Sequence, residues 1–308
     1  MSGPQRFFLL GPTAAGKTEV ALALARRLQA DIYSLDSMLV YRGMDVGTAK
    51  PSSEQRAAVP HFLLDLVEPS EAFSASRWVE AARAAEAGAS GRRALYVGGT
   101  SLYLKSLLHG LPEGREVPAA IRDALQLEWL EEGGPQLLRA ELERVDPVAA
   151  ARIHVRDAQR TLRALGHARA FGQPWSSALA PWPAQGALGV PAVALRWPRA
   201  SLHARITERF LQMMKDGLLE EVSRLKANPG FGPTARRAIG YRHLLSHLEQ
   251  GQPLAQAIGQ AQRDTRVLVR RQETWLRSFP DLQWIEAGDG CAPEELAERA
   301  ARALSPEG

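Results

Sequence analysis

The stretch GPTAAGKT, Gly11 to Thr18, decides the fold, because it fits the phosphate-binding pattern G-x-x-x-x-G-K-[ST] without a mismatch. The run RFFLL before it is typical of a strand, and the run TEVALALARRL after it has apolar residues at helical spacing. In a strand, glycine turn and helix, backbone N–H groups and the helix N-terminus attract an anion, and Lys17 adds a full charge. The predicted loop, with the Thr18 hydroxyl offered to Mg²⁺, consists of Gly11, Pro12, Thr13, Ala14, Ala15, Gly16, Lys17 and Thr18.

The composition indicates a cytoplasmic protein with an anionic partner. With 308 residues, 45% hydrophobic residues and no long apolar run, the chain has room for a full α/β core plus a smaller unit, and we expect no membrane contact. A single cysteine, Cys291, excludes a disulfide framework and a cysteine-based zinc site. The net charge of +4 favours a polyanion. Arginine dominates the basic residues and suits phosphate oxygens, although the codon bias of a GC-rich genome explains its excess equally well.

Alternating strands and helices continue after the loop. Further strands are expected at residues 30–37, 61–67, 94–100 and 191–197, with a helix at 74–87. Such alternation predicts a largely parallel sheet with ligands at the carboxyl ends of its strands. Several polar and glycine residues fall at those ends and should crowd the phosphate-binding loop: Asp36, Ser37, Gly98, Gly99 and Thr100.

The middle of the chain changes character. From Val117 to about Phe171 the sequence reads as helices, with Asp146 and Asp157 as caps, and a loop rich in Pro, Ser, Gly and Ala follows. We therefore predict an α/β fold with a parallel sheet of the phosphate-binding-loop type, interrupted by an all-helical insertion domain. The catalytic core would comprise residues 1–112 and 189–308, and the insertion residues 113–188.

The carboxy-terminal part is expected to be helical almost to its end, after a helix capped by Ser201. Within it, arginines recur on one helix face and favour nucleic-acid phosphates over a merely solvated surface. This stripe consists of Arg263, Arg266, Arg270 and Arg277, with Arg271 adjacent. The two histidines spaced four apart, His243 and His247, are expected on a solvated face.

Two carboxylates follow apolar strands, Asp36 after IYSL and Asp65 after HFLL. Either could serve a phosphoryl-transfer site as a metal carboxylate or as a base, and the residues alone do not rank them. The guanine-reading pattern N-K-x-D does not occur, which argues against a GTPase. A small-molecule or nucleotide kinase and a non-catalytic RNA-binding ATPase or chaperone stay open as alternatives.

Longer motifs resemble one family closely. The strings DSMLVYRGMDVGTAKP, HFLLDLVEP, VGGTSLYLKSLLHGL, DPVAAARIHVRDAQR, RRAIGYR and TRVLVRRQETWLR, together with GPTAAGKT, are similar in order and content to the tRNA dimethylallyltransferases, also called tRNA isopentenyltransferases. They cover residues 7 to about 277. The resemblance implies transfer of a dimethylallyl group from its diphosphate to N6 of the adenosine at tRNA position 37, so the loop would hold a prenyl diphosphate and need not hold ATP.

The resemblance also implies roles for individual residues. Asp36 would accept the proton of the attacking amine, with Thr100 nearby, while Lys17 would neutralise the leaving diphosphate with Mg²⁺ on Thr18. A helix cap or a ligand of metal-bound water is the alternative reading of Asp36. Contacts to the anticodon stem-loop of tRNA are implied for Asp36, Ser37, Met38, Leu39, Thr100, Arg122, Gln159, Arg160, Arg163, Arg237, Arg242, Arg270, Arg271 and Arg277.

Two features depart from the family pattern. Leu39 stands where family members commonly have Gln, which removes a possible amide contact to the extruded base or its neighbour. The cysteine-and-histidine zinc module of eukaryotic relatives is missing from the sequence. We therefore expect a bacterial, cytoplasmic and monomeric form.

Overall fold

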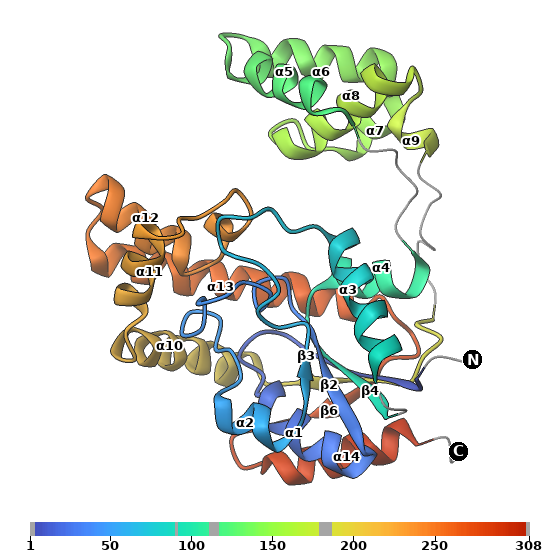
Figure 1. The fold of residues 1–308 in the computed structure, drawn as a ribbon, viewed down its shortest axis with the longest axis vertical. Helices are drawn as coiled ribbons and strands as arrows, with labels where there is room; N and C mark the ends of the chain where they lie inside the picture. The colour runs from blue at the N-terminus through green and yellow to red at the C-terminus, as the bar shows by residue number, and fades with distance from the viewer. Residues whose placement is uncertain (1–3, 90–91, 111–116, 179–186, 306–308) are drawn as a thin grey trace. The chain divides into compact units, whose positions relative to one another are not determined.

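The computed structural model describes residues 4–89, 92–110, 117–178 and 187–305, and the chain divides into two compact units. One unit comprises residues 1–108 and 185–308, and the other comprises residues 109–184 (Figure 1). The boundary expected at residues 112–113 lies outside the described residues. Each unit has a hydrophobic core of its own.

A sheet of six parallel strands forms the centre of the larger unit, in the order β3-β2-β4-β1-β5-β6. The strands are β1 Arg6–Leu10, β2 Ala30–Leu35, β3 His61–Phe62, β4 Arg93–Gly98, β5 Ala192–Arg196 and β6 Gln283–Glu286. Leu10 and Leu35 both pair with Gly98, so β1, β2 and β4 end level with one another. The loops that follow these three strands therefore meet at one edge of the sheet.

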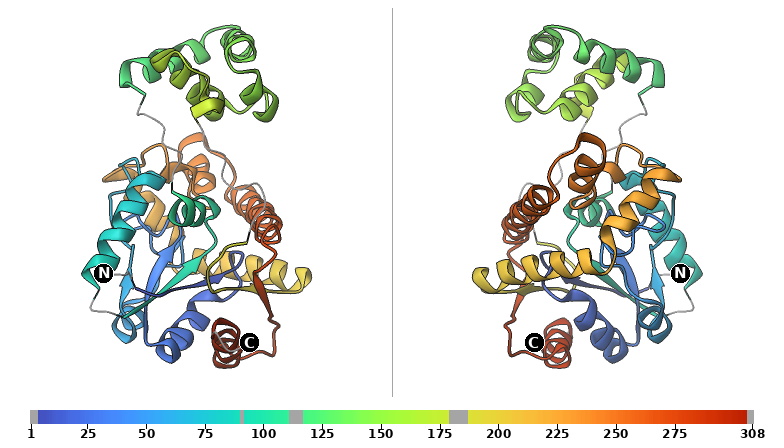
Figure 2. Two further views of the ribbon diagram at one scale, coloured as in Figure 1. Left: turned by 90° about the vertical axis from the view of Figure 1, so that its right-hand side faces the viewer. Right: turned by 90° about the vertical axis from the view of Figure 1, so that its left-hand side faces the viewer.

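Helices cover both faces of this sheet, because the strands β1, β2, β4 and β5 bury side chains on both faces. Phe7 and Leu9 of β1 pack in one core with α1 (Lys17–Leu28) and α14 (Pro293–Leu304), whereas Phe8 and Leu10 pack in the other with α3 (Ala75–Gly88) and α4 (Ser101–His109). In Figure 2 the blue α1 and the dark red α14 lie together against one face. The helices of this unit are α1 Lys17–Leu28, α2 Ser53–Ala58, α3 Ala75–Gly88, α4 Ser101–His109, α10 Arg199–Lys215, α11 Leu218–Ala227, α12 Tyr241–Gln250, α13 Leu254–Leu276 and α14 Pro293–Leu304, with a 3₁₀ turn at Ala235–Arg237.

The smaller unit is helical in its described part, as the sequence predicts. Its helices are α5 Ala119–Leu130, α6 Gly134–Val145, α7 Pro147–Arg152, α8 Ala158–Phe171 and α9 Trp175–Ala178. Both predicted caps are confirmed, since Asp146 accepts a hydrogen bond from the Ala149 amide and Asp157 from the Arg160 amide. The predicted fold class, an α/β protein with a parallel sheet and an all-helical insertion, is thus confirmed.

Four local expectations were wrong. The run at residues 61–67 leaves the sheet after Phe62, because Leu63 and Asp65 adopt positive φ angles of 67° and 54°. A strand, β6, interrupts the expected carboxy-terminal helices, and the expected loop contains the short helix α9. The helix assigned to a Ser201 cap begins at Arg199 after Pro198, and the Ser201 hydroxyl donates to Asp289 instead.

Candidate active site

The phosphate-binding loop connects β1 to α1 in the predicted way. The helix begins at Lys17, and its N-cap Gly16 takes a left-handed conformation with φ 76°, which a residue with a side chain rarely adopts. Gly16 has no side chain with which to cap the first turn, so the first amide groups of α1 have no capping acceptor on that residue. Thr18 lies in this first turn. Together with the helix dipole, these amides make the loop suitable for a diphosphate.

Lys17 supplies a full positive charge over the loop. Its ammonium group donates a 2.6 Å hydrogen bond to the carbonyl oxygen of Pro12. Burial lowers the pKa of Lys17 to about 8, the negative charge of Asp36 raises it in part, and the positive charge of Arg209 lowers it further. The ammonium therefore lies within electrostatic reach of both Asp36 and a second cation.

Two arginines of α10 complete the positive charge around the loop. The Arg205 Nε donates to the carbonyl oxygen of Ala14 at 3.0 Å, and its guanidinium lies 4.3 Å from the centre of the Trp197 ring. Burial lowers the pKa of Arg209, while Asp36 and Glu19 raise it. Neither arginine is predicted from the sequence pattern. Their spacing of four, in HARITERF, places them on one helix face, but only the fold brings that face to the loop.

Asp36 and Thr100 meet beside the loop, as predicted from the strand ends. The Ser37 amide donates to the Thr100 hydroxyl oxygen at 3.2 Å, and one carboxylate oxygen of Asp36 accepts from the Met38 amide at 2.8 Å. Asp36 caps a turn of the loop after β2 and not a helix. Since Asp36 also raises the pKa values of Lys17 and Arg209, its carboxylate lies within electrostatic reach of both cations beside the loop.

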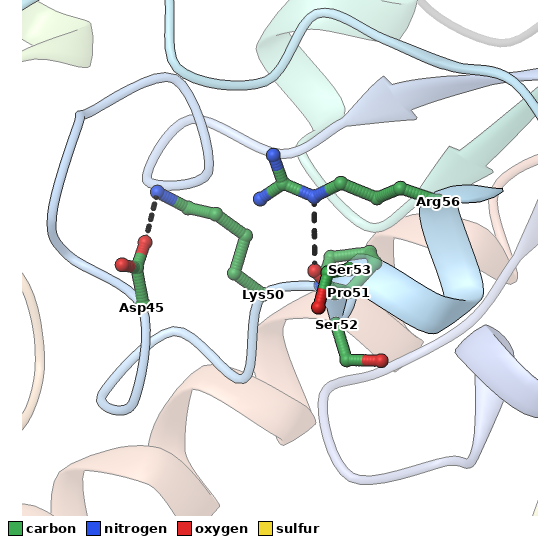
Figure 3. Close-up of a pocket in the computed structure, with 6 residues that line it drawn as sticks. All are labelled: Asp45, Lys50, Pro51, Ser52, Ser53 and Arg56. Atoms are coloured by element: carbon green, nitrogen blue, oxygen red, sulfur yellow. Dashed lines mark hydrogen bonds and ion pairs between the residues drawn. The ribbon is translucent and has the colours of Figure 1, made fainter.

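Asp65, the other candidate carboxylate, is fully committed to neighbouring cations. One of its oxygens accepts from the Lys50 ammonium at 2.6 Å and the other from Arg56 at 2.7 Å. Burial alone would raise the pKa of Asp65, but the hydrogen bonds from Lys50 and Arg56 outweigh it and lower that pKa. Lys50 also pairs with Asp45, as Figure 3 shows at the pocket they share. Both carboxylate oxygens of Asp65 are thus bound by cations, which leaves Asp36 as the better candidate for a base.

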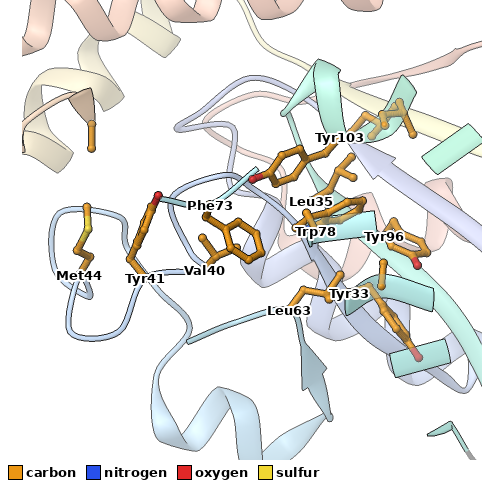
Figure 4. Close-up of a cluster of buried hydrophobic side chains, with 14 of the residues drawn as sticks. Tyr33, Leu35, Val40, Tyr41, Met44, Leu63, Phe73, Trp78, Tyr96 and Tyr103 are labelled. Carbon is orange, nitrogen blue, oxygen red and sulfur yellow. The ribbon is translucent and has the colours of Figure 1, made fainter. Parts of the chain in front are cut away.

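Packing in the core and hydrogen bonds to α11 both fix the segment that follows Asp36. Tyr41 and Met44 are fully buried in a cluster with aromatic residues of α3 and α4, among them Trp78 and Tyr103 (Figure 4). Glu221 of α11, itself buried, accepts hydrogen bonds from the amides of three successive residues, 45 to 47. Met38 and Leu39 are half-buried at the start of the segment. The residues of this segment that are predicted to contact tRNA therefore lie on a loop that is fixed by the core and by Glu221.

Exposed cations lie on α13 and near α12. Among the predicted tRNA contacts, Arg237, Arg242, Arg270, Arg271 and Arg277 are all exposed. Arg242 pairs with Asp264 and Arg277 with Glu273, whereas no ion pair of Arg270 or Arg271 occurs among the described residues.

Two expectations about this region need correction. Arg266 is half-buried and donates to the Thr207 hydroxyl, so the exposed arginine stripe is shorter than expected. His243 is buried, not solvated, and its ring lies 3.0 Å from a carboxylate oxygen of Asp264.

The helical unit carries the other predicted contacts. Arg122 lies on α5, and Gln159, Arg160 and Arg163 lie on α8, which packs against α5; all four side chains are exposed. Arg160 pairs with Asp157 at 3.5 Å.

Among the described residues, no helix is both long and apolar enough to cross a membrane.

Comparisons with known proteins agree along the whole chain. A family model described as IPP transferase matches residues 39–279, and one described as isopentenyl transferase matches residues 4–65. The chain is 44% identical to the tRNA dimethylallyltransferase of Methylibium petroleiphilum, over 98% of this chain and 94% of that protein. It is also 44% identical to the tRNA dimethylallyltransferase of Thiobacillus denitrificans, over 97% and 95% of the two chains.

Solved structures give the same result. The tRNA isopentenylpyrophosphate transferase of Bacillus halodurans has a TM-score of 0.70 and 32% identity, over 97% of this chain and 96% of that one. A eukaryotic dimethylallyltransferase acting on tRNA has a TM-score of 0.75 over 92% of this chain and 74% of that one, and at 23% identity this likeness concerns the fold.

Proposed function

The chain belongs to the IPP transferase family, and from this membership we propose that it transfers a dimethylallyl group from dimethylallyl diphosphate to N6 of the adenosine at tRNA position 37. The products are N6-isopentenyladenosine in tRNA and free diphosphate. The observation that carries the proposal is the Asp36 carboxylate, which lies within electrostatic reach of the Lys17 ammonium, while the next residue, Ser37, donates its amide to the Thr100 hydroxyl oxygen. Asp36 can thus take up a proton while Lys17 holds the departing diphosphate.

The phosphate-binding loop holds the diphosphate of the donor. When the bond between the allylic carbon and oxygen breaks, its electron pair stays on the diphosphate, and that growing charge must be neutralised. Lys17, Arg205 and Arg209 lie around the loop and supply that charge together with the amides of the first turn of α1. Because these groups are already in place, little reorganisation accompanies the departure of the diphosphate.

Asp36 and Thr100 act on the acceptor. The N6 amine attacks the allylic carbon, a bond forms between nitrogen and carbon, and one N6 proton passes to the Asp36 carboxylate. The hydrogen bond from Met38 holds one oxygen of that carboxylate. The Thr100 hydroxyl oxygen accepts from Ser37 and has a second lone pair with which to accept from the other N6 hydrogen, so it orients the amine and leaves the nitrogen lone pair free.

Thr18 fits a magnesium ion, because oxygen atoms, hydroxyl oxygens among them, are the donors that this hard cation prefers. Thr18 is half-buried in the first turn of α1, and its position in GKT is the one that offers a hydroxyl to Mg²⁺ in phosphate-binding loops. When bound, Mg²⁺ would withdraw charge from the diphosphate.

Recognition of tRNA uses both units. N6 lies inside the base stack of the anticodon loop, so the base must be drawn out to reach Asp36. The exposed arginines of α13 and those of α5 and α8 carry charges suited to tRNA phosphates. We propose further that the protein acts as a monomer in the cytoplasm.

A mass measurement on nucleosides tests the proposed function. Purified protein is incubated with Mg²⁺, unmodified tRNA and either dimethylallyl diphosphate or ATP, and the RNA is digested and weighed by mass spectrometry. A five-carbon gain on one adenosine, seen only with the prenyl donor, is the expected result. Turnover of ATP without an adduct would instead favour a kinase or an ATPase.

Arg270 and Arg271 should set the salt dependence of tRNA binding. Replacing both with Ala removes two exposed charges, so the slope of log K against log salt should become shallower by about 1 to 2. Filter binding at several salt concentrations measures that slope. Arg26→Ala, which removes an exposed charge from the far end of α1, is the matched control and should leave it unchanged. An unaltered slope in the double variant would remove these arginines from the phosphate contacts.

A further inference from the structure

One amide side chain of α13 joins two loops of the site. The Gln272 Oε1 accepts a hydrogen bond from the Thr13 amide at 3.0 Å, and its Nε2 donates to the Gly99 carbonyl oxygen at 3.1 Å. Thr13 belongs to the phosphate-binding loop, whereas Gly99 directly precedes Thr100. The two loops are far apart in sequence, so this contact exists only because α13 lies beside the carboxyl ends of β1 and β4.

The chemistry of the contact requires an amide. Thr13 presents only a donor and Gly99 only an acceptor, so the partners fix the orientation of the Gln272 amide. Glutamate would keep the acceptor but lose the donor, and methionine would lose both while keeping the length of the side chain. Asparagine carries the same amide on a stem one methylene shorter and would not reach these two groups from α13.

The packing around the amide has no spare room. A Cβ at position 99 would lie 2.5 Å from the Gln272 Nε2 and 2.8 Å from the Gly11 carbonyl oxygen, so only glycine fits there. Gly11 opens the phosphate-binding loop. The backbone of the loop that carries Thr100 therefore lies directly against that of the phosphate-binding loop, with Gln272 inserted beside both.

We propose that Gln272 is a positioning residue that fixes the distance between the diphosphate-binding loop and the loop that carries Thr100. The inference rests on the proposed function, since the first loop holds the donor and the second adjoins the acceptor residues. From Gln272 one chain of contacts runs through Thr13 into the loop of Lys17. A second runs through Gly99 and Thr100 to the Ser37 amide, next to Asp36. Transfer needs the donor carbon and the acceptor nitrogen in line and close together, and a small displacement of either loop lowers the rate steeply.

Gln272→Met is the decisive variant. At saturating tRNA and donor, its single-turnover rate should fall between about tenfold and a hundredfold, with Kd values for both substrates within about twofold of wild type. Gln272→Glu should also be slow, because a carboxylate would face the Gly99 carbonyl oxygen. Gln260→Met is the matched control: Gln260 lies on the same helix and loses a hydrogen bond to Gln252 outside the site, so its rate should stay unchanged.

Hydrogen exchange separates a positioning role from general destabilisation. Gln272→Met should speed exchange of the amides of residues 11–16 and 98–101 while those of α14 and the centre of β1 stay protected as in wild type. An unchanged single-turnover rate, a loss confined to substrate affinity, or faster exchange throughout the core would each overturn the inference. If wild-type protein transfers no prenyl group, the proposed function fails, and exchange in the two loops still decides whether Gln272 holds them.

Discussion

Asp36→Asn is expected to lower the single-turnover rate of prenyl transfer about a thousandfold, because a positioned general base contributes that order of acceleration. The amide oxygen of Asn can still accept from the Met38 amide, so the turn after β2 should keep its shape. What the substitution removes is the oxygen able to take up the N6 proton. Rapid-quench measurement of modified tRNA, with both substrates saturating, gives the rate.

The binding of the donor distinguishes a base from a ligand. If Asp36 acts as the base, dimethylallyl diphosphate should bind to Asp36→Asn at least as tightly as to wild type, since a negative charge beside the diphosphate has been removed. A large loss of donor affinity would place Asp36 in the metal and diphosphate site instead. A retained rate would exclude it as the base.

Asp65→Asn is the matched control for that experiment. Asp65 also follows a strand, but both of its oxygens are bound by Lys50 and Arg56. Its loss leaves Arg56 without this carboxylate and Lys50 with Asp45 alone, and should lower the melting temperature. The rate measured well below that temperature should stay near the wild-type value. Comparison of the two variants thus separates a loss of catalysis from a loss of stability.

The sequence predicts the sheet well because its signals are local. The apolar runs of β1, β2, β4 and β5 and the glycine pattern of the loop each identify an element without knowledge of the others. Since parallel strands end at one edge, the meeting of Asp36 and Thr100 also follows from the pattern alone. The missed strand β6 has four residues inside a helical region, and only its pairing with β5 makes it a strand.

The rest of the site depends on tertiary packing. Arg205, Arg209 and Gln272 reach the phosphate-binding loop from α10 and α13, which begin about 180 and 240 residues after that loop. Arginines on a helix face are usually solvated, and no local signal says which face turns inward. The same reason explains Arg266 and His243, which were expected at the surface and are half-buried and buried. Side chains that close a site from a distant helix need the fold before they can be assigned.

Lys17→Met should weaken donor binding about a hundredfold at pH 7.5, because it removes a full charge from the loop and keeps most of the length of the unbranched stem. Calorimetric titration with dimethylallyl diphosphate measures the effect. Lys17→Arg, which keeps the charge, is the control and should lose much less affinity. Equal losses in both variants would mean that the shape of the side chain matters and not its charge.

The pH dependence of the same titration carries the sharper test, since burial lowers the pKa of free Lys17 to about 8. Only the protonated amine attracts the diphosphate, and the bound anion raises its pKa. Wild-type affinity should therefore be full below pH 8 and fall about tenfold per pH unit above it until the pKa of the complex is reached. Lys17→Met should show no such fall. A flat wild-type profile between pH 7.5 and 9.5 would contradict the assignment of Lys17 to the donor.

The lowered pKa also implies that Lys17 disfavours folding. In the unfolded chain the amine returns to its ordinary pKa of 10.5, so between pH 8 and 10.5 the unfolded state binds more protons. The free energy of unfolding therefore rises with pH across that window. Below pH 8 the charge of Lys17 lowers it by a constant amount. Lys17→Met should accordingly melt at a higher temperature than wild type at pH 7, although it binds the donor more weakly. A charge that destabilises the free protein and is needed by its ligand is the expected property of an anion-binding site.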